Sequence, residues 1–235
     1  MDGSFRSSPS EQQSNESMER IALAFAAILA FTDCNDCDST SAPETVLVGK
    51  PSSPIMDPAR WTIGPVIGPN NYSVGMPLRP SATDGWSFEF PPPPGSVHYV
   101  TTPAPPLAPG QWITITFEVQ GKGRLLAVQP KPRPGLLRLH IQRAEDDWSG
   151  QGEYQHYRFW SRPIKVSPGT HTMNVPLDYR QWTSVFGKKD KTGFNSTVAN
   201  AALVGFTFGH NFAGHGVYRS SKEPVRFILK DFTVQ

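Results

Sequence analysis

Hydrophobic and polar residues alternate with a period of two along most of the chain after residue 85. The clearest example is the range 111–119, in which Ile113, Ile115, Phe117 and Val119 alternate with other residues. This period indicates a β-strand with one face against a core, because successive side chains point to opposite sides. The pattern predicts strands over the ranges 86–90, 98–101, 111–119, 137–142, 154–160, 171–177, 203–208 and 225–234.

Short strands separated by turn residues are typical of an all-β fold, here a two-sheet antiparallel β-sandwich of the jelly-roll kind. We expect at most short helices over 178–186 and 196–202, where no long amphipathic stripe is present. One face of each sheet should contact solvent. The alternation then predicts a core that contains Phe88, Phe90, Ile113, Ile115, Phe117, Leu137, Leu139, Val204, Phe206, Phe208 and Phe227.

The N-terminal residues 1–42 are expected to be an extension with an export signal. An apolar run over 21–32 follows Arg20, and its 12 residues match the apolar region of a signal peptide. The run is too short to span a bilayer, so we do not expect a transmembrane protein. The predicted location is secreted or periplasmic, with Cys34 as a candidate site for a lipid anchor. A short buried helix is the alternative for the same run.

Prolines separate this N-terminal part from the predicted sandwich. Of the 24 prolines, 19 lie between Pro43 and Pro134, and Gly-Pro and Asn-Asn pairs accompany them. We therefore expect residues 43–80 to form a linker or a strap packed on the domain, with Trp61 as its anchor. Residues 81–235 are the predicted β-sandwich domain.

Charge is distributed unevenly along the chain. Residues 1–119 carry 5 Lys and Arg against 12 Asp and Glu, whereas residues 120–235 carry 17 against 8. A basic body attracts polyanions such as acidic polysaccharide or nucleic acid, although a solvated surface explains the same charge. The short basic run 188–191 contains no aromatic residues, so we do not expect nucleic-acid binding.

The last strands resemble those of the galactose-binding-like jelly-roll superfamily. The resemblance lies in Leu203-Val-Gly-Phe-Thr-Phe-Gly209, the glycine-rich loop after it, and Val225-Arg-Phe-Ile-Leu-Lys-Asp-Phe-Thr-Val234. Asp84-Gly-Trp-Ser-Phe88 is similar to the first core strand of that superfamily. The resemblance covers roughly residues 82–235. It implies a non-catalytic carbohydrate-binding module, of the kind that accompanies glycan-active enzymes.

The densest cluster of polar and aromatic residues lies between residues 138 and 162. Alternation places Arg138, His140 and Gln142 on one face of a strand, opposite Leu137, Leu139 and Ile141. On the predicted strand 154–160 it places Phe159 in the core and four residues on the exposed face: Tyr154, His156, Arg158 and Trp160. Two such strands would form a platform on which a sugar ring stacks. An ordinary solvated sheet face, with Arg over Tyr and Trp, is the alternative.

Two loops supply further candidate ligand contacts. Trp148 lies in a loop of polar and small residues, where it either stacks on a ligand or packs back on the sandwich. The glycine-bounded loop 209–216 contains His210, Asn211 and His215, which we expect to contact ligand at the rim of the sandwich. A purely structural loop, a shared metal ion and a general base are the other interpretations of these histidines.

Metal binding is predicted at one place only. Asp84 and Asp231, near the two ends of the fold, are candidate ligands of a structural calcium ion, although either could simply cap a turn. The pair Cys34 and Cys37 has no second pair of ligands nearby and does not predict a zinc site. We expect no other cofactor.

The function that these patterns favour is that of an exported, non-catalytic carbohydrate-binding domain that prefers acidic polysaccharide. One alternative is a polysaccharide lyase or glycoside hydrolase with His156 or His210 as base and Tyr154 as proton donor. A glycoside hydrolase needs two carboxylates at a controlled separation. The sequence shows that the acids at 145–147 and Glu153 are clustered, but not how far apart their carboxylates lie. A second alternative is an envelope or assembly protein whose exposed aromatic residues bind another protein. No phosphate-binding loop, nucleophile elbow or zinc-protease motif is present.

Overall fold

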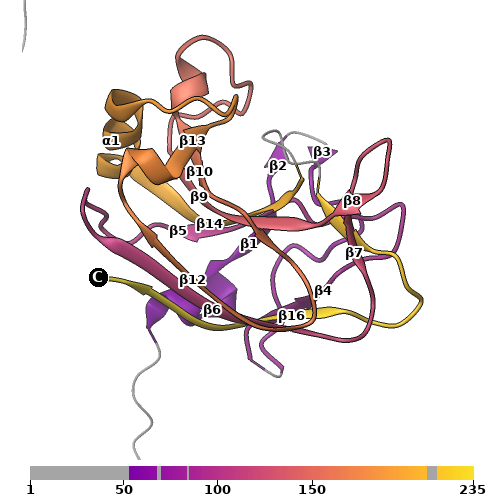
Figure 1. Cartoon of the computed structure of the whole chain (residues 1–235). Coiled ribbons are helices and arrows are strands. Elements are labelled where there is room, and N and C mark those ends of the chain that lie inside the picture. Colours follow the sequence, from indigo (N-terminus) through magenta and orange to yellow (C-terminus); the bar gives the residue numbers. More distant parts are fainter. Residues whose placement is uncertain (1–52, 68–69, 84, 211–215) are drawn as a thin grey trace, which may run out of the picture. The chain divides into compact units, whose positions relative to one another are not determined.

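A computed structural model describes residues 53–67, 70–83, 85–210 and 216–235 of the chain. The predicted export segment 1–42 lies outside the described residues. In the described part the structure is mostly β, with antiparallel sheets in two layers (Figure 1). The prediction of an all-β sandwich is confirmed at this level.

The upper layer in Figure 1 is a sheet of seven strands. Its order is β1-β5-β14-β9-β10-β13, and β11 pairs with β9 beside this path. The strands are β1 (Thr62–Gly64), β5 (Tyr99–Pro103), β14 (Ala201–Gly209), β9 (Leu136–Arg143), β10 (Arg158–Ser161), β13 (Trp182–Ser184) and β11 (Ile164–Lys165). All of these strands pair antiparallel.

The lower layer is a sheet of four strands in the order β12-β6-β16-β4. They are β12 (Gly169–Pro176), β6 (Trp112–Gln120), β16 (Arg226–Val234) and β4 (Ser87–Glu89). Strand β16 changes register against β6 between Leu229 and Asp231, and the extra residue lets both halves of the strand keep apolar side chains inside.

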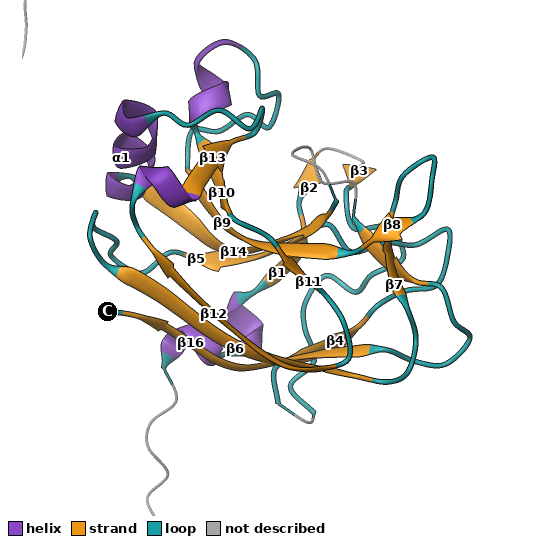
Figure 2. Cartoon of the chain, viewed as in Figure 1, coloured by secondary structure: helices purple, strands orange, loops and turns teal. Residues whose placement is uncertain are grey.

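Small sheets and short helices lie at the margins of the two layers (Figure 2). The small sheets contain β15 (Val217–Arg219), β7 (Leu125–Ala127) and β8 (Arg133–Pro134) in one, and β2 (Val66–Ile67) and β3 (Asn70–Asn71) in the other. The helical segments are α1 (Lys191–Ala199) and the 3-10 turns η1 (Pro54–Met56), η2 (Pro58–Arg60), η3 (Gly152–His156) and η4 (Tyr179–Gln181). No helix among the described residues is long and apolar enough to cross a bilayer.

The space between the two layers is filled by aromatic and aliphatic side chains. Trp61 stacks on Phe206 with ring centroids 5.3 Å apart, and Phe88 stacks on Phe227 at 5.2 Å. Every residue of the predicted core is buried, so the register inferred from the alternation is confirmed for these strands. Burying such side chains stabilises the fold by about 1.5–3 kcal/mol each.

The proline-rich range 43–80 contributes directly to the sandwich where it is described. Strand β1 pairs with β5 at the edge of the larger sheet, and Trp61 just before it is fully buried. The Trp61 indole donates a hydrogen bond to the carbonyl of Ile55 at 2.7 Å. The expected anchor is therefore in place, and the boundary at residue 81 falls inside the structural unit rather than at its edge.

Two local predictions are wrong. Tyr154 and His156 belong to the 3-10 turn η3, and the strand predicted over 154–160 begins only at Arg158. The cause lies just upstream, since Gly150 and Gly152 both adopt positive φ and bend the chain before it can extend. The helix predicted over 196–202 instead ends at Ala199, because the residues from Ala201 onward pair with β9.

Candidate functional site

The outer face of the larger sheet is covered at its centre. On β9 the inward residues Leu137, Leu139 and Ile141 are buried, as expected, but Arg138, His140 and Gln142 on the opposite side are only 7%, 0% and 2% exposed. A strand buried on both faces needs a second layer above it. The loop after β9 and the segment after β13 provide this layer, with Trp148 and Val185 packed on Tyr99 and Trp160.

These residues surround a pocket of about 210 Å³ on the outer face of the sheet. Five aromatic side chains contribute to its wall, together with a histidine and an arginine. The lining residues are Tyr72, His98, Tyr99, Trp148, Ser149, Gly150, Arg158, Trp160, Val185 and Phe186. We refer to this site as the aromatic pocket.

Trp148 is held in the pocket wall by an unusual backbone conformation. Its φ of 67° lies in the left-handed region, which is uncommon for a residue with a bulky side chain. The Asp146 carboxylate stabilises this turn by accepting a hydrogen bond from the Trp148 amide at 2.9 Å. The indole then lies edge-to-face against Tyr99, with centroids 5.1 Å apart. Strain of this kind persists where the surroundings fix it, often at a binding site.

A buried ion pair lies beside Trp148. The Arg158 Nε is 2.6 Å from Asp146 Oδ2, and both side chains are almost fully buried. The guanidinium carbon of Arg158 also lies 4.8 Å from the centroid of the Trp148 ring, within the range of a cation–π contact. Burial raises the pKa of the Asp146 carboxyl, and the charge of Arg158 opposes this rise. The pair therefore attaches the loop that contains Trp148 to strand β10, on which Arg158 lies.

His140 forms the floor behind this wall and is neutral. The Trp160 indole donates to His140 Nδ1 at 3.1 Å, which leaves the proton on Nε2 to be donated to Gln142 Oε1 at 3.1 Å. Burial lowers the pKa of His140 to about 3, and the nearby charge of Arg158 acts in the same direction. Burial likewise raises the pKa of Tyr99 to about 12. Neither group is a general base or acid near neutral pH.

The exposed platform predicted from the sequence is therefore wrong in its form. Arg138, His140, Arg158 and Trp160 do share one face of adjacent strands, but all four are buried. Trp148, from the loop after β9, packs on Trp160, and of these four residues only Arg158 and Trp160 also line the aromatic pocket. The sequence placed Phe159 correctly, since it is fully buried in the core against Phe194.

The other predicted contacts lie away from the aromatic pocket. Tyr154 packs against Tyr157, and His156 Nδ1 lies 2.7 Å from an oxygen of Asp190. His210 Nδ1 is 3.1 Å from the carbonyl oxygen of Pro134 in β8. Asn211 and His215 lie outside the described residues, so their part in ligand binding stays a prediction.

Several residues of the pocket were not among the predicted contacts: Tyr72, His98, Tyr99, Val185 and Phe186. The same is true of Asp146, which holds Arg158 and the Trp148 turn beside the pocket. Tyr99 lies on a predicted strand next to Val100. Because consecutive side chains of a strand point to opposite faces, and Val100 is in the core, the alternation places Tyr99 on the outer face. Nothing in the local sequence of Tyr72 or Phe186 indicates that these two distant segments line the same pocket, because their proximity depends on the path of the loops.

The predicted calcium site has only one residue in the described part. Asp231 lies on β16 opposite Thr116, whereas Asp84 lies outside the described residues. Among the described residues, no group of three or more His, Cys, Asp or Glu side chains could hold a metal ion. The calcium site stays a prediction.

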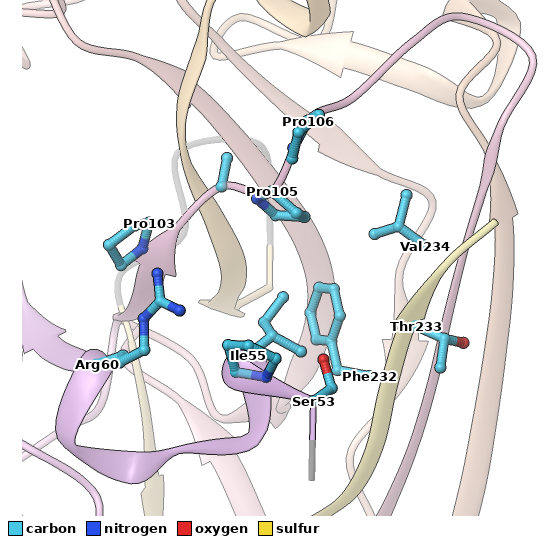
Figure 3. A pocket seen from close by; sticks show the side chains of 11 residues that line it. Ser53, Ile55, Arg60, Pro103, Pro105, Pro106, Phe232, Thr233 and Val234 are labelled. Atoms are coloured by element: carbon cyan, nitrogen blue, oxygen red, sulfur yellow. The ribbon is translucent and has the colours of Figure 1, made fainter. Parts of the chain in front are cut away.

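Larger cavities have a different chemistry. One of about 480 Å³ opens near the N-terminal turns, where prolines of the range 103–106 face Phe232 and Val234 of β16 (Figure 3). Arg60 is the only charged residue in its lining. Another, of about 550 Å³, is lined by four basic residues and no aromatic ones: Lys122, Arg124, Arg133 and Lys165. Neither combines stacked aromatic rings with a buried ion pair, so the aromatic pocket is the better candidate site.

Comparisons with protein-family models, with curated proteins and with solved structures found no match. The functional argument therefore depends on the geometry of the chain itself.

Proposed function

We propose that the chain is an exported carbohydrate-binding domain that holds one sugar ring of a glycan in the aromatic pocket. The observation that carries the proposal is the arrangement of Tyr99, Trp148 and Trp160 around a small cavity with Arg158 and His98 at its polar positions. A pyranose ring has one apolar face and a rim of hydroxyls, so it needs both an aromatic surface and hydrogen-bonding groups.

The size of the pocket supports a ligand of one ring. Pockets for drug-sized ligands usually measure about 300–1,000 Å³. A pocket of about 210 Å³ is smaller and fits a single ring, with the rest of a longer glycan outside it. Aromatic rings fixed by the Asp146–Arg158 pair are preorganised, which reduces the entropy that binding has to remove.

Binding without catalysis explains the electrostatics of the pocket better than a lyase or hydrolase mechanism does. A general base needs a pKa near the working pH, whereas burial takes the pKa of His140 and that of Tyr99 far from neutrality in opposite directions. The carboxylate of Asp146 is engaged by Arg158. Tyr154, His156 and His210, the groups considered for catalysis, are not part of the pocket lining.

The test is a glycan array with two matched tryptophan variants. Trp148→Ala removes the ring in the pocket wall, whereas Trp112→Ala removes a 42% exposed tryptophan on β6 of the other sheet. We expect Trp148→Ala to weaken binding by about 1–3 kcal/mol, the range measured for base–aromatic stacking, and Trp112→Ala to leave it unchanged. Circular dichroism checks that both variants are folded.

Two results would contradict this function. If the wild-type protein bound no glycan on the array, carbohydrate binding would be wrong. If both tryptophan variants lost binding equally, the ligand would not lie in the aromatic pocket. Export is tested separately by sequencing the N-terminus of protein isolated from its host, which we expect to begin after Thr32.

A further inference from the structure

A second cavity, of about 300 Å³, lies on the same outer face of the larger sheet as the aromatic pocket. Four of its eight lining residues are basic and none is acidic: Arg138, Ser161, Arg162, Pro163, Arg180, Gln181, Thr183 and Lys189. We refer to it as the cationic cavity. Its charge is not used by the proposed binding of a single ring.

The pairing of the strands places the cationic cavity next to the aromatic pocket. Thr183 of β13 lies opposite Trp160 of β10, so one strand pair contributes to both sites. On the other side, Thr207 of β14 lies opposite both Arg138 and Tyr99. Residues directly opposite on neighbouring strands are about 4.5–5.5 Å apart, so the two sites are contiguous.

Arg138 is the most unusual residue of the cationic cavity. It is only 7% exposed, and burial lowers the pKa of its guanidinium from the usual range. Its Nη2 donates to the carbonyl of His210 at 3.4 Å, a long hydrogen bond. No ion pair joins Arg138 to a carboxylate of the described residues. Buried charges in proteins are normally paired, so this position favours an anion from outside.

The remaining charges leave the cavity with an excess of cations. Arg180 is neutralised by Asp178, whose Oδ2 accepts from Arg180 Nε at 2.8 Å. Arg162 and Lys189 are exposed, and neither forms an ion pair with a described carboxylate. The hydrogen bonds from Arg180 lower the pKa of the Asp178 carboxyl, and the charge of Lys189 acts in the same direction. Three cations therefore face the cavity around one compensated pair.

We infer that the cationic cavity is an anion subsite, which binds a carboxylate or sulfate group of an acidic glycan while a ring of that glycan occupies the aromatic pocket. This inference rests on the proposed function and names the class of glycan. Guanidinium groups suit both anions, because their planar donors pair with two oxygens at once. No aromatic side chain lines the cationic cavity, which disfavours a nucleic acid that stacks its bases there.

The experiment uses an array that holds uronate oligosaccharides beside their methyl esters, and sulfated oligosaccharides beside their desulfated forms. Arg162→Ala and Lys189→Ala remove exposed cations and spare the fold. Arg133→Ala is the matched control, because it removes an exposed cation of β8 that lines other cavities. We expect the wild type to bind the acidic member of a pair about tenfold more tightly, as one charge-assisted hydrogen bond would give. This preference should disappear in Arg162→Ala and Lys189→Ala and remain in Arg133→Ala.

The outcomes separate the subsite from the function on which it rests. If acidic and neutral members bound equally and Trp148→Ala abolished both, glycan binding would stand and the anion subsite would be wrong. Equal losses in Arg133→Ala and Arg162→Ala would also overturn the subsite, since the preference would then come from overall charge. If a single-stranded oligonucleotide bound through Arg162 and Lys189 more tightly than any uronate, the ligand of the cationic cavity would be a nucleic acid and not a glycan. If no glycan bound, the proposed function and the subsite would both fail.

Discussion

The two faces of the larger sheet both bury aromatic rings, but they hold them by different forces. On the inner face Trp61 and Phe206 stack with other apolar rings, and the contacts are almost entirely hydrophobic. On the outer face Tyr99, Trp148 and Trp160 are interleaved with a histidine, an arginine and an aspartate. Inner rings are selected for volume, because a core has to be filled. Outer rings are oriented by directional bonds, which costs stability and leaves a shaped cavity.

This contrast shows that burial alone does not distinguish a core from a binding site. His140 is as fully buried as Phe206, yet it lies on the outer face of the sheet, beneath the residues that cover that face. What distinguishes the outer cluster is that its polar groups are paired with one another next to a pocket that remains open. Sites that preorganise dipoles and charges in this way are candidates for function, because an apolar packing would be at least as stable.

The largest expected effect is on the inner face. Phe206→Ala should lower the free energy of unfolding by about 3–5 kcal/mol, since it leaves a cavity where the ring stacked on Trp61. Phe186→Ala is the control, because this ring is 58% exposed at the pocket mouth, and its loss should change stability by less than about 0.5 kcal/mol. Urea unfolding measures both. A similar loss in the two variants would show that the distinction between the faces is wrong.

The buried ion pair of the outer face should come next. Asp146→Ala leaves Arg158 buried without its partner and should destabilise the domain by about 3 kcal/mol. The double variant Asp146→Leu with Arg158→Met should recover most of this loss. As a control, Glu118→Ala breaks the more exposed pair with Lys230 and should cost less than about 1 kcal/mol. If Asp146→Ala behaved like Glu118→Ala, the pair would not anchor the Trp148 loop.

The last prediction is a pH dependence due to His140, which has no effect near neutral pH and grows only as the solution is acidified. Its pKa falls from the ordinary 6.5 to about 3 in the fold, so the unfolded chain binds the proton first as the pH decreases. This contribution to stability is present above pH 6.5 and is lost as the pH falls towards 3, by up to about 1.4 kcal/mol per pH unit. His140→Gln should remove that slope, measured as urea midpoints between neutral and acidic pH.

His171→Gln is the matched control for this slope, because His171 lies on β12 of the other sheet and its Nε2 contacts only the carbonyl of Ser167 among the bonds described. It should keep the wild-type pH dependence. An unchanged slope in His140→Gln would mean that His140 is not held neutral in the fold, and the hydrogen bond from Trp160 would need another assignment.

Much of the sandwich follows from local patterns in the sequence. The alternation of Ile113, Ile115 and Phe117 determines which face of β6 is inside, because a strand has a period of two in every context. The same argument placed Phe159 and Phe206 correctly. It failed at Tyr154 and His156, where the positive φ values of Gly150 and Gly152 turn the chain before a strand can form.

The sequence by itself thus determined the fold class, the core face of most strands and three of the residues that line the aromatic pocket, Trp148, Arg158 and Trp160. It could not determine that the outer face of β9 is covered. The alternation shows that consecutive side chains lie on opposite faces of a strand, but it does not show which other segments pack on each face. Only the tertiary structure decided that Trp148, from the loop, and Tyr72, from a distant segment, close over Tyr99 and Trp160. Loop paths depend on many weak long-range contacts, and these leave no period in the sequence.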